Sequence, residues 1–147
     1  MAKRSSTEYL IIHCSSTRPS MDIGREEIDA WHRHRGFLMV GYNYVVRRNG
    51  TVEVGRPEDE SGAHARGYNH KSIGIALVGG CTEDDVKVAE NNFTSEQWES
   101  LDTLVRGLKV NYPKAKVLGH RDLEGVTKEC PSFDVQSWLD DSSSVAL

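Results

Sequence analysis

Short apolar runs with the length of buried strands alternate along this chain with segments of helical pattern. Three runs stand out, at 9–13, 73–78 and 116–119. The first two are continuous and rich in β-branched residues, which is typical of strands buried on both faces. This alternation of strands and helices limits the fold to a layered arrangement of helices on a sheet.

One pair of strands is predicted to form a hairpin. Asn49-Gly50 separates the apolar stretches at 42–47 and 51–56, and this dipeptide readily supplies the positive φ angles of a tight turn. A hairpin joins antiparallel strands, so the sheet is expected to be mixed and not purely parallel.

Three helices are predicted. The first covers about 25–35, the second opens at the capping box of Thr94 and Gln97 and ends before Pro113, and a short last one carries Val135. The expected order is β-α-β-β-β-α-β-α. The fold class is therefore α/β, as one domain with a central mixed sheet flanked by about three helices.

Length and composition narrow the range of functions. With 147 residues, the chain is expected to form a single domain over 1–147, with flexible ends at 1–8 and 141–147. A domain of this size buries about two thirds of its unfolded surface, so it needs no structural metal. The net charge is −4, and the sequence contains no stripe of basic residues, which excludes direct nucleic-acid binding. Three cysteines, an odd number, indicate free thiols in a reducing compartment.

No targeting segment is recognisable. The charged start of the chain lacks the apolar core of a signal peptide, and no apolar run has transmembrane length. The sequence therefore predicts a protein without a membrane partner, which needs another factor to reach any target outside the cytoplasm.

Two histidines and a cysteine form a candidate metal site. His13 and His120 each end an apolar run, and Cys130 follows in the next loop. Two imidazoles and one thiolate would leave the fourth tetrahedral position of Zn²⁺ open for water, as a hydrolytic site requires. Spacing alone leaves open that these are two buried histidines and a structural thiol. Cys14 is expected to point to the opposite face of the strand from His13.

Further candidates lie near these ligands in sequence or in small-residue loops. Lys128 precedes Cys130 closely and could stabilise an oxyanion, although a solvated lysine is the ordinary alternative. Tyr42, at the predicted start of a strand, could hydrogen-bond water or a substrate carbonyl, or serve as a core aromatic. The loop with His64 and Asn69 suits a groove wall or a plain solvated loop. The remaining histidines, His32, His34 and His70, are expected to be solvated.

Taken together, these motifs resemble a known family, the zinc-dependent N-acetylmuramoyl-L-alanine amidases related to peptidoglycan-recognition proteins, and in particular the T7-like bacteriophage lysozymes. The resemblance runs from about Ile11 to Trp138. The short motifs that carry it are Ile12-His13-Cys14-Ser15, Ala30-Trp31-His32, Gly41-Tyr42, Asn49-Gly50-Thr51-Val52, Ala63 to Asn69, Ser72-Ile73-Gly74, Leu77-Val78-Gly79-Gly80, Gly119-His120-Arg121-Asp122 and Lys128 to Phe133.

The resemblance implies a role for seven residues. His13, His120 and Cys130 would hold one Zn²⁺ per chain. Tyr42 and Lys128 would assist catalysis, whereas His64 and Asn69 would line the substrate groove. The implied reaction is hydrolysis of the amide bond between N-acetylmuramic acid and L-alanine in peptidoglycan. No carboxylate is singled out as a general base.

The resemblance also implies a setting. A monomeric phage endolysin would be made in the host cytoplasm and released to the wall by a holin-type partner. Some members also bind and inhibit their phage's RNA polymerase through an N-terminal arm, which is a few residues shorter here. The rival functions are a peptidoglycan-binding module without catalysis, a polymerase-binding regulator whose amidase activity is secondary, and a glycosidase. The glycosidase would need a dedicated carboxylate pair, and the sequence singles out none.

Overall fold

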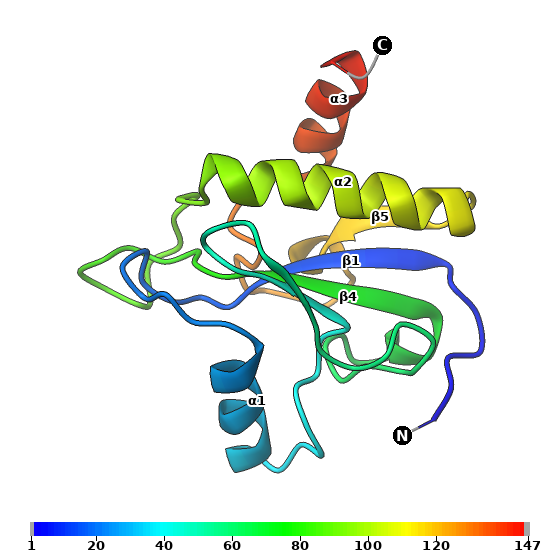
Figure 1. Cartoon of the computed structure of the whole chain (residues 1–147), viewed down its shortest axis with the longest axis horizontal. Coiled ribbons are helices and arrows are strands. Elements are labelled where there is room, and N and C mark those ends of the chain that lie inside the picture. Colours follow the sequence, from blue (N-terminus) through cyan, green and yellow to red (C-terminus); the bar gives the residue numbers. More distant parts are fainter. Residues whose placement is uncertain (1, 146–147) are drawn as a thin grey trace.

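The computed structural model describes residues 2–145, without the side chains of 142–145, and confirms the predicted order of strands and helices (Figure 1). Single 3₁₀ turns at Asn69–Lys71 and His120–Asp122 are added to that order. The main elements are β1 (Tyr9–Cys14), α1 (Arg25–His34), β2 (Tyr44–Val46), β3 (Val52–Val54), β4 (Ser72–Leu77), α2 (Ser95–Asn111), β5 (Lys116–Gly119) and α3 (Val135–Val145).

The five strands form one mixed sheet in the order β3-β2-β4-β1-β5. β1 is parallel to both of its neighbours, so that Ile12 pairs with Ile75 of β4 and with Gly119 of β5. β2 is parallel to β4 and antiparallel to β3. The carboxyl ends of β1, β4 and β5 therefore meet at one edge of the sheet, where sites in α/β folds usually gather.

The two faces of β1 have different partners. Leu10, Ile12 and Cys14 belong to the core beneath α2, whereas Ile11 packs with residues on the other face. Figure 1 shows α2 across one side of the sheet and α1 on the other. Because side chains alternate along a strand, His13 shares the face of Ile11 and lies away from α2. The predicted opposite orientation of Cys14 is confirmed.

The hairpin exists, but its regular strands are shorter than predicted. Tyr42 lies before β2 and not at its start. The N–H groups of Gly55 and Arg56 still donate to the carbonyls of Asn43 and Tyr42, at 2.8 and 2.9 Å. A Cβ atom at Gly55 would lie 2.2 Å from the Tyr42 carbonyl oxygen, so the two backbones approach too closely for a regular ladder. In the turn, φ is positive at Gly50 (89°) but not at Asn49.

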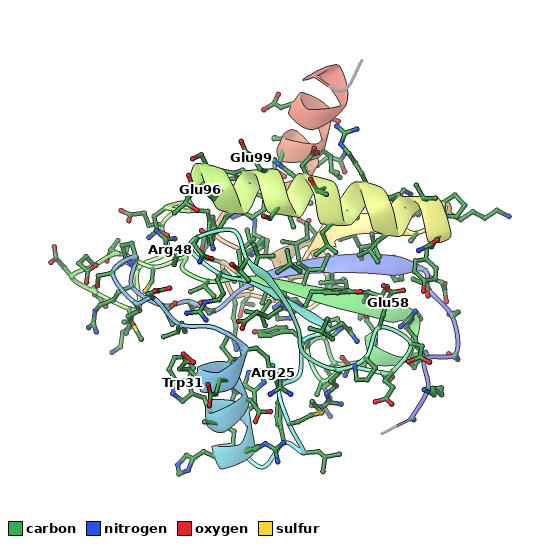
Figure 2. The ribbon with its side chains drawn as sticks, viewed as in Figure 1. Arg25, Trp31, Arg48, Glu58, Glu96 and Glu99 are labelled. Carbon is green, nitrogen blue, oxygen red and sulfur yellow. The ribbon has the colours of Figure 1, made fainter. Side chains whose placement is uncertain are left out.

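The capping box at the start of α2 is confirmed. The Gln97 N–H donates to Thr94 Oγ1 at 3.1 Å, and the Thr94 N–H donates to Gln97 Oε1 at 3.0 Å. These two hydrogen bonds satisfy two N–H groups that would otherwise be unpaired at the N-terminus of the helix. Glu96 and Glu99, labelled in Figure 2, lie on the exposed outer face of the same helix.

Gln97 also ties α2 to the sheet. Its side chain is fully buried, and its Nε2 donates to the carbonyls of Val46 at 3.1 Å and Val78 at 2.8 Å. Arg48, beneath the N-terminal end of α2 in Figure 2, donates to Gln97 Oε1 at 3.2 Å. The amide is thus a second donor to each carbonyl, because the Val46 oxygen also accepts the Val78 N–H at 3.0 Å and the Val78 oxygen also accepts from Arg48 at 3.3 Å.

We expect Gln97→Ala to lower the free energy of unfolding by about 2–4 kcal/mol, because it removes the hydrogen bonds of a buried amide and leaves the Thr94 N–H without its acceptor in the capping box. Urea denaturation measures the change. Gln136→Ala is the matched control, since Gln136 is exposed in α3, and it should shift stability by less than about 0.5 kcal/mol. Equal effects of the two substitutions would contradict the role assigned to Gln97.

The segment before β1 lies along the body of the protein. The Arg4 N–H donates to the Asp59 carbonyl and the Glu8 N–H to that of Lys71, both at 2.8 Å. The predicted flexible ends, 1–8 and 141–147, fall partly on residues that the structure does not describe. Among the described residues, no helix combines the length and the apolar character that a membrane span needs.

Candidate metal centre and its cleft

The sheet brings the three candidate ligands together. His13 is near the end of β1, and His120 follows directly after β5, the parallel neighbour of β1. Their rings lie 4.6 Å apart between centroids. With Cys130, they offer three ligand atoms that all lie within 4.8 Å of one another.

A loop returns Cys130 to the end of β1. The Arg121 N–H donates to the Cys130 carbonyl at 2.8 Å, which closes the loop after β5. Cys130 Sγ accepts the Cys14 N–H at 3.2 Å and lies 3.9 Å from His13 Nδ1. Ligand atoms around a tetrahedral zinc ion are separated by about 3.5 Å. The donor types therefore fit zinc, and the three ligand atoms lie close enough together to hold one metal ion.

The electrostatics of the three donors also fit a metal. Burial, and then the neighbouring histidines, hold the pKa of His13 well below its usual value, and burial followed by Lys128 lowers the pKa of His120. Both imidazoles are thus neutral, as metal ligands must be. The hydrogen bond with Cys14 and burial raise the pKa of the Cys130 thiol. A bound cation would reverse this rise by stabilising the thiolate.

A cleft of about 570 Å³ opens over these donors. It contains all seven residues singled out from the sequence: His13, Tyr42, His64, Asn69, His120, Lys128 and Cys130. The Tyr42 ring centroid lies 5.1 Å from that of His13. Burial, followed by the nearby thiols, raises the pKa of Tyr42 above its usual value. Its hydroxyl therefore stays protonated at neutral pH and can donate a hydrogen bond.

The cleft is cationic although the chain is acidic overall. Arg35, Arg66 and Lys128 line it, and none of the described residues along its wall is an aspartate or glutamate. The Arg35 guanidinium lies 5.3 Å above the ring of Phe37, another residue of the wall. Such a lining favours ligands that carry carboxylates.

Residues 3–133 match the family described as N-acetylmuramoyl-L-alanine amidase. The chain belongs to this amidase family. It is 44% identical over 137 residues to the endolysin of Enterobacteria phage K11, a match that covers 93% of this chain and 88% of that endolysin. It is 43% identical over 143 residues to the endolysin of Escherichia phage T7, with 97% and 92% covered.

Solved structures of the amidase family have the same fold. An N-acetylmuramoyl-L-alanine amidase from Clostridium intestinale superposes with a TM-score of 0.77 at 28% identity, covering 94% of this chain and 86% of the other. In sequence, peptidoglycan-recognition protein LB of Drosophila melanogaster is 32% identical over 145 residues, covering 88% of this chain and 58% of that protein. Catalytic amidases and recognition proteins thus share this fold.

One prediction about the histidines is wrong. His32 is 7% exposed and not solvated, because Gly41 N–H donates to its Nδ1 at 2.8 Å and Phe37 and Tyr42 pack beside its ring. The charged residues around it in sequence lie on the outer face of α1 and conceal this burial. His34 and His70 are exposed, as predicted.

Two contacts in the amidase site were not predicted. Asn69 Oδ1 accepts the N–H groups of His64 and Ala65, both at 2.9 Å, so this side chain shapes the loop itself. Ser72 Oγ lies 3.3 Å from His64 Nε2. Ser72 lies in one of the short motifs that carry the resemblance, but a serine at the first position of a strand is ordinary and does not by itself predict a contact with His64.

Proposed function

We propose that this chain is a zinc-dependent endolysin that hydrolyses the amide bond between N-acetylmuramoyl and L-alanine in peptidoglycan. Its membership of the amidase family and its similarity to phage endolysins support the reaction. The observation that carries the zinc assignment is the triangle of His13, His120 and Cys130, whose ligand atoms lie within 4.8 Å of one another at the floor of a cleft.

The three ligands leave room for the chemistry of an open metal site. When bound, zinc supplies a Lewis acid for the amide carbonyl and lowers the pKa of water from about 15.7 toward 7. His13 and His120 would bind as neutral imidazoles and Cys130 as a thiolate. The site is half-buried at Cys130 and deeply buried at His13, which strengthens electrostatic interactions inside it.

Tyr42 and Lys128 are the proposed catalytic side chains. Both line the cleft beside the ligands. The Tyr42 hydroxyl, which keeps its proton, would donate a hydrogen bond to the carbonyl oxygen of the scissile amide. The Lys128 ammonium would stabilise the negative charge that develops on that oxygen. No carboxylate of the described cleft wall is placed to act as a general base.

The substrate would lie along the cationic wall. Stem peptides carry carboxylates, which complement Arg35 and Arg66. His64 and Asn69 are proposed to line the same groove. The absence of aspartate and glutamate from the described wall speaks against a glycosidase, which uses a pair of carboxylates about 5–9 Å apart.

Digestion of purified peptidoglycan tests the reaction. We expect the zinc-loaded protein to release stem peptides that begin with L-alanine, and to leave the glycan strands intact. Mass spectrometry identifies the peptides, and a reducing-end assay follows the glycan. A chelator should abolish release, and added Zn²⁺ should restore it.

Two outcomes would overturn the proposal. New reducing sugar ends would mean that a glycosidic bond is cleaved. Tight wall binding without soluble products would mean that the chain is a recognition module, the role of other proteins with this fold.

The setting of the enzyme is also part of the proposal. We infer a monomer that is made in the host cytoplasm and reaches the wall after a holin-type partner opens the membrane, because its relatives are phage endolysins. Phage RNA polymerase is a proposed second partner. Sedimentation tests the monomer, expression with and without a holin tests release, and a pull-down with the cognate polymerase tests the second partner.

A further inference from the structure

Both ring nitrogens of His13 are engaged on opposite sides. Nδ1 faces Cys130 Sγ at 3.9 Å, within the ligand cluster. Nε2 lies 2.8 Å from His64 Nδ1, on the far side of the ring. Only Nδ1 is therefore available to a metal. A nitrogen that binds a metal offers a lone pair, so the proton of the neutral His13 ring must be on Nε2.

The position of that proton is fixed further along a chain of hydrogen bonds. Ser72 Oγ donates to the Tyr68 carbonyl at 2.7 Å and lies 3.3 Å from His64 Nε2. A hydroxyl has one proton, which the carbonyl takes, so Ser72 Oγ can only accept from His64 Nε2. His64 Nδ1 is then left with a lone pair and accepts the Nε2–H of His13.

The His64 ring is held tightly in this orientation. A Cβ atom at Gly74 would lie 2.5 Å from His64 Cγ, and one at Gly62 would lie 2.5 Å from its Cδ2. The ring therefore occupies space that a side chain at either position would fill. The backbone of His64 is also held, because its N–H donates to Asn69 Oδ1. Ser72 is fully buried at the start of β4, so its hydroxyl has no solvent partner to turn toward.

We propose that His64 and Ser72 are positioning residues, which hold His13 in the tautomer that presents Nδ1 to the metal. The inference rests on the zinc site proposed above and adds a role to His64 beyond the groove wall. Hydrogen-bond partners of metal ligands typically contribute about 10–100-fold to metal affinity. We expect a loss of that size when the acceptor on His64 is removed.

Nuclear magnetic resonance of the metal-free, isotope-labelled protein tests the tautomers directly. Long-range proton–nitrogen spectra should show protons on Nε2 of both His13 and His64. Ser72→Ala should leave His64 as a mixture of tautomers. A proton on Nδ1 of His13 in the wild-type protein would overturn the proposal, whatever the zinc affinity.

Zinc affinity, measured by competition with a chromophoric chelator, provides the second test. His64→Leu removes the acceptor and should weaken zinc binding by about 10–100-fold. His64→Asn keeps an acceptor oxygen near the place of Nδ1 and should restore most of the affinity. His70→Leu, at an exposed histidine, should bind zinc like the wild type. Unchanged affinity in both His64→Leu and Ser72→Ala would refute the positioning role.

The two proposals fail in different ways. If the tautomers are as stated but the wild-type protein binds no zinc, the zinc assignment fails and the hydrogen-bond chain stands. If zinc binds to His13, His120 and Cys130 while His13 carries its proton on Nδ1 without metal, the positioning role fails alone. Should His64→Leu not fold, Ser72→Ala carries the affinity test.

Discussion

Cys130→Ser is expected to lose zinc and amidase activity together. The thiolate is the only sulfur among the three candidate ligands, and a serine hydroxyl replaces it with a weakly acidic oxygen that binds Zn²⁺ poorly. Since even the loss of a ligand's hydrogen-bond partner costs about 10–100-fold in metal affinity, the loss of the ligand should exceed about 100-fold. Metal content after dialysis and release of soluble stem peptide measure the two effects.

Cys81→Ser is the matched control for this substitution. Like Cys130, Cys81 is a free thiol, but it is fully buried and is not one of the three clustered donors. It should retain zinc and activity even if it lowers stability. A Cys130→Ser protein with full zinc content and full activity would refute the ligand assignment.

Lys128→Ala is expected to retain zinc and lose activity by about 10²–10³-fold, the usual cost of removing one group that stabilises an oxyanion. Lys128 is exposed at the cleft and is not part of the donor cluster, so its removal leaves the metal ligands intact. The loss should fall on kcat more than on KM, because the charge that Lys128 stabilises develops only in the transition state.

Lys87→Ala removes the same charge at another exposed lysine, which lines a smaller neighbouring pocket. It should remain fully active. If both variants lost activity equally, general charge attraction of the wall polymer would explain the effect. A fully active Lys128→Ala protein that still carries zinc would remove Lys128 from the catalytic residues.

Local sequence signals explain why much of the fold was predictable. Continuous apolar runs, the Asn-Gly turn and the capping box of Thr94 are local signals, and each predicted its element. His13 and His120 were each predicted to end an apolar strand, and sites in α/β folds usually gather at the carboxyl ends of strands. The limits of the hairpin were not predictable, since they depend on the close approach of Gly55 to Tyr42.

Contacts between distant segments account for what the sequence did not predict. His32 is surrounded by charge in sequence, yet it is buried because Gly41 returns to its ring. The composition of the His64 loop suited either a groove wall or a solvated loop, and only the family resemblance implied that His64 lines the groove. Its contact with His13 depends on the space left by Gly74, a residue of a different strand. Neither contact has a local pattern that could indicate it.

The position of β1 at the centre of the parallel strands has a consequence for protein synthesis. β1 emerges first from the ribosome, but its two neighbours in the sheet, β4 and β5, emerge much later, and Cys130 follows both. A strand can pair only with strands that have already been synthesised. The donor cluster therefore cannot assemble on a nascent chain that ends before Cys130. A polypeptide that ends before Cys130 would therefore lack one of the three proposed ligands, and only a nearly complete chain would present the full donor set.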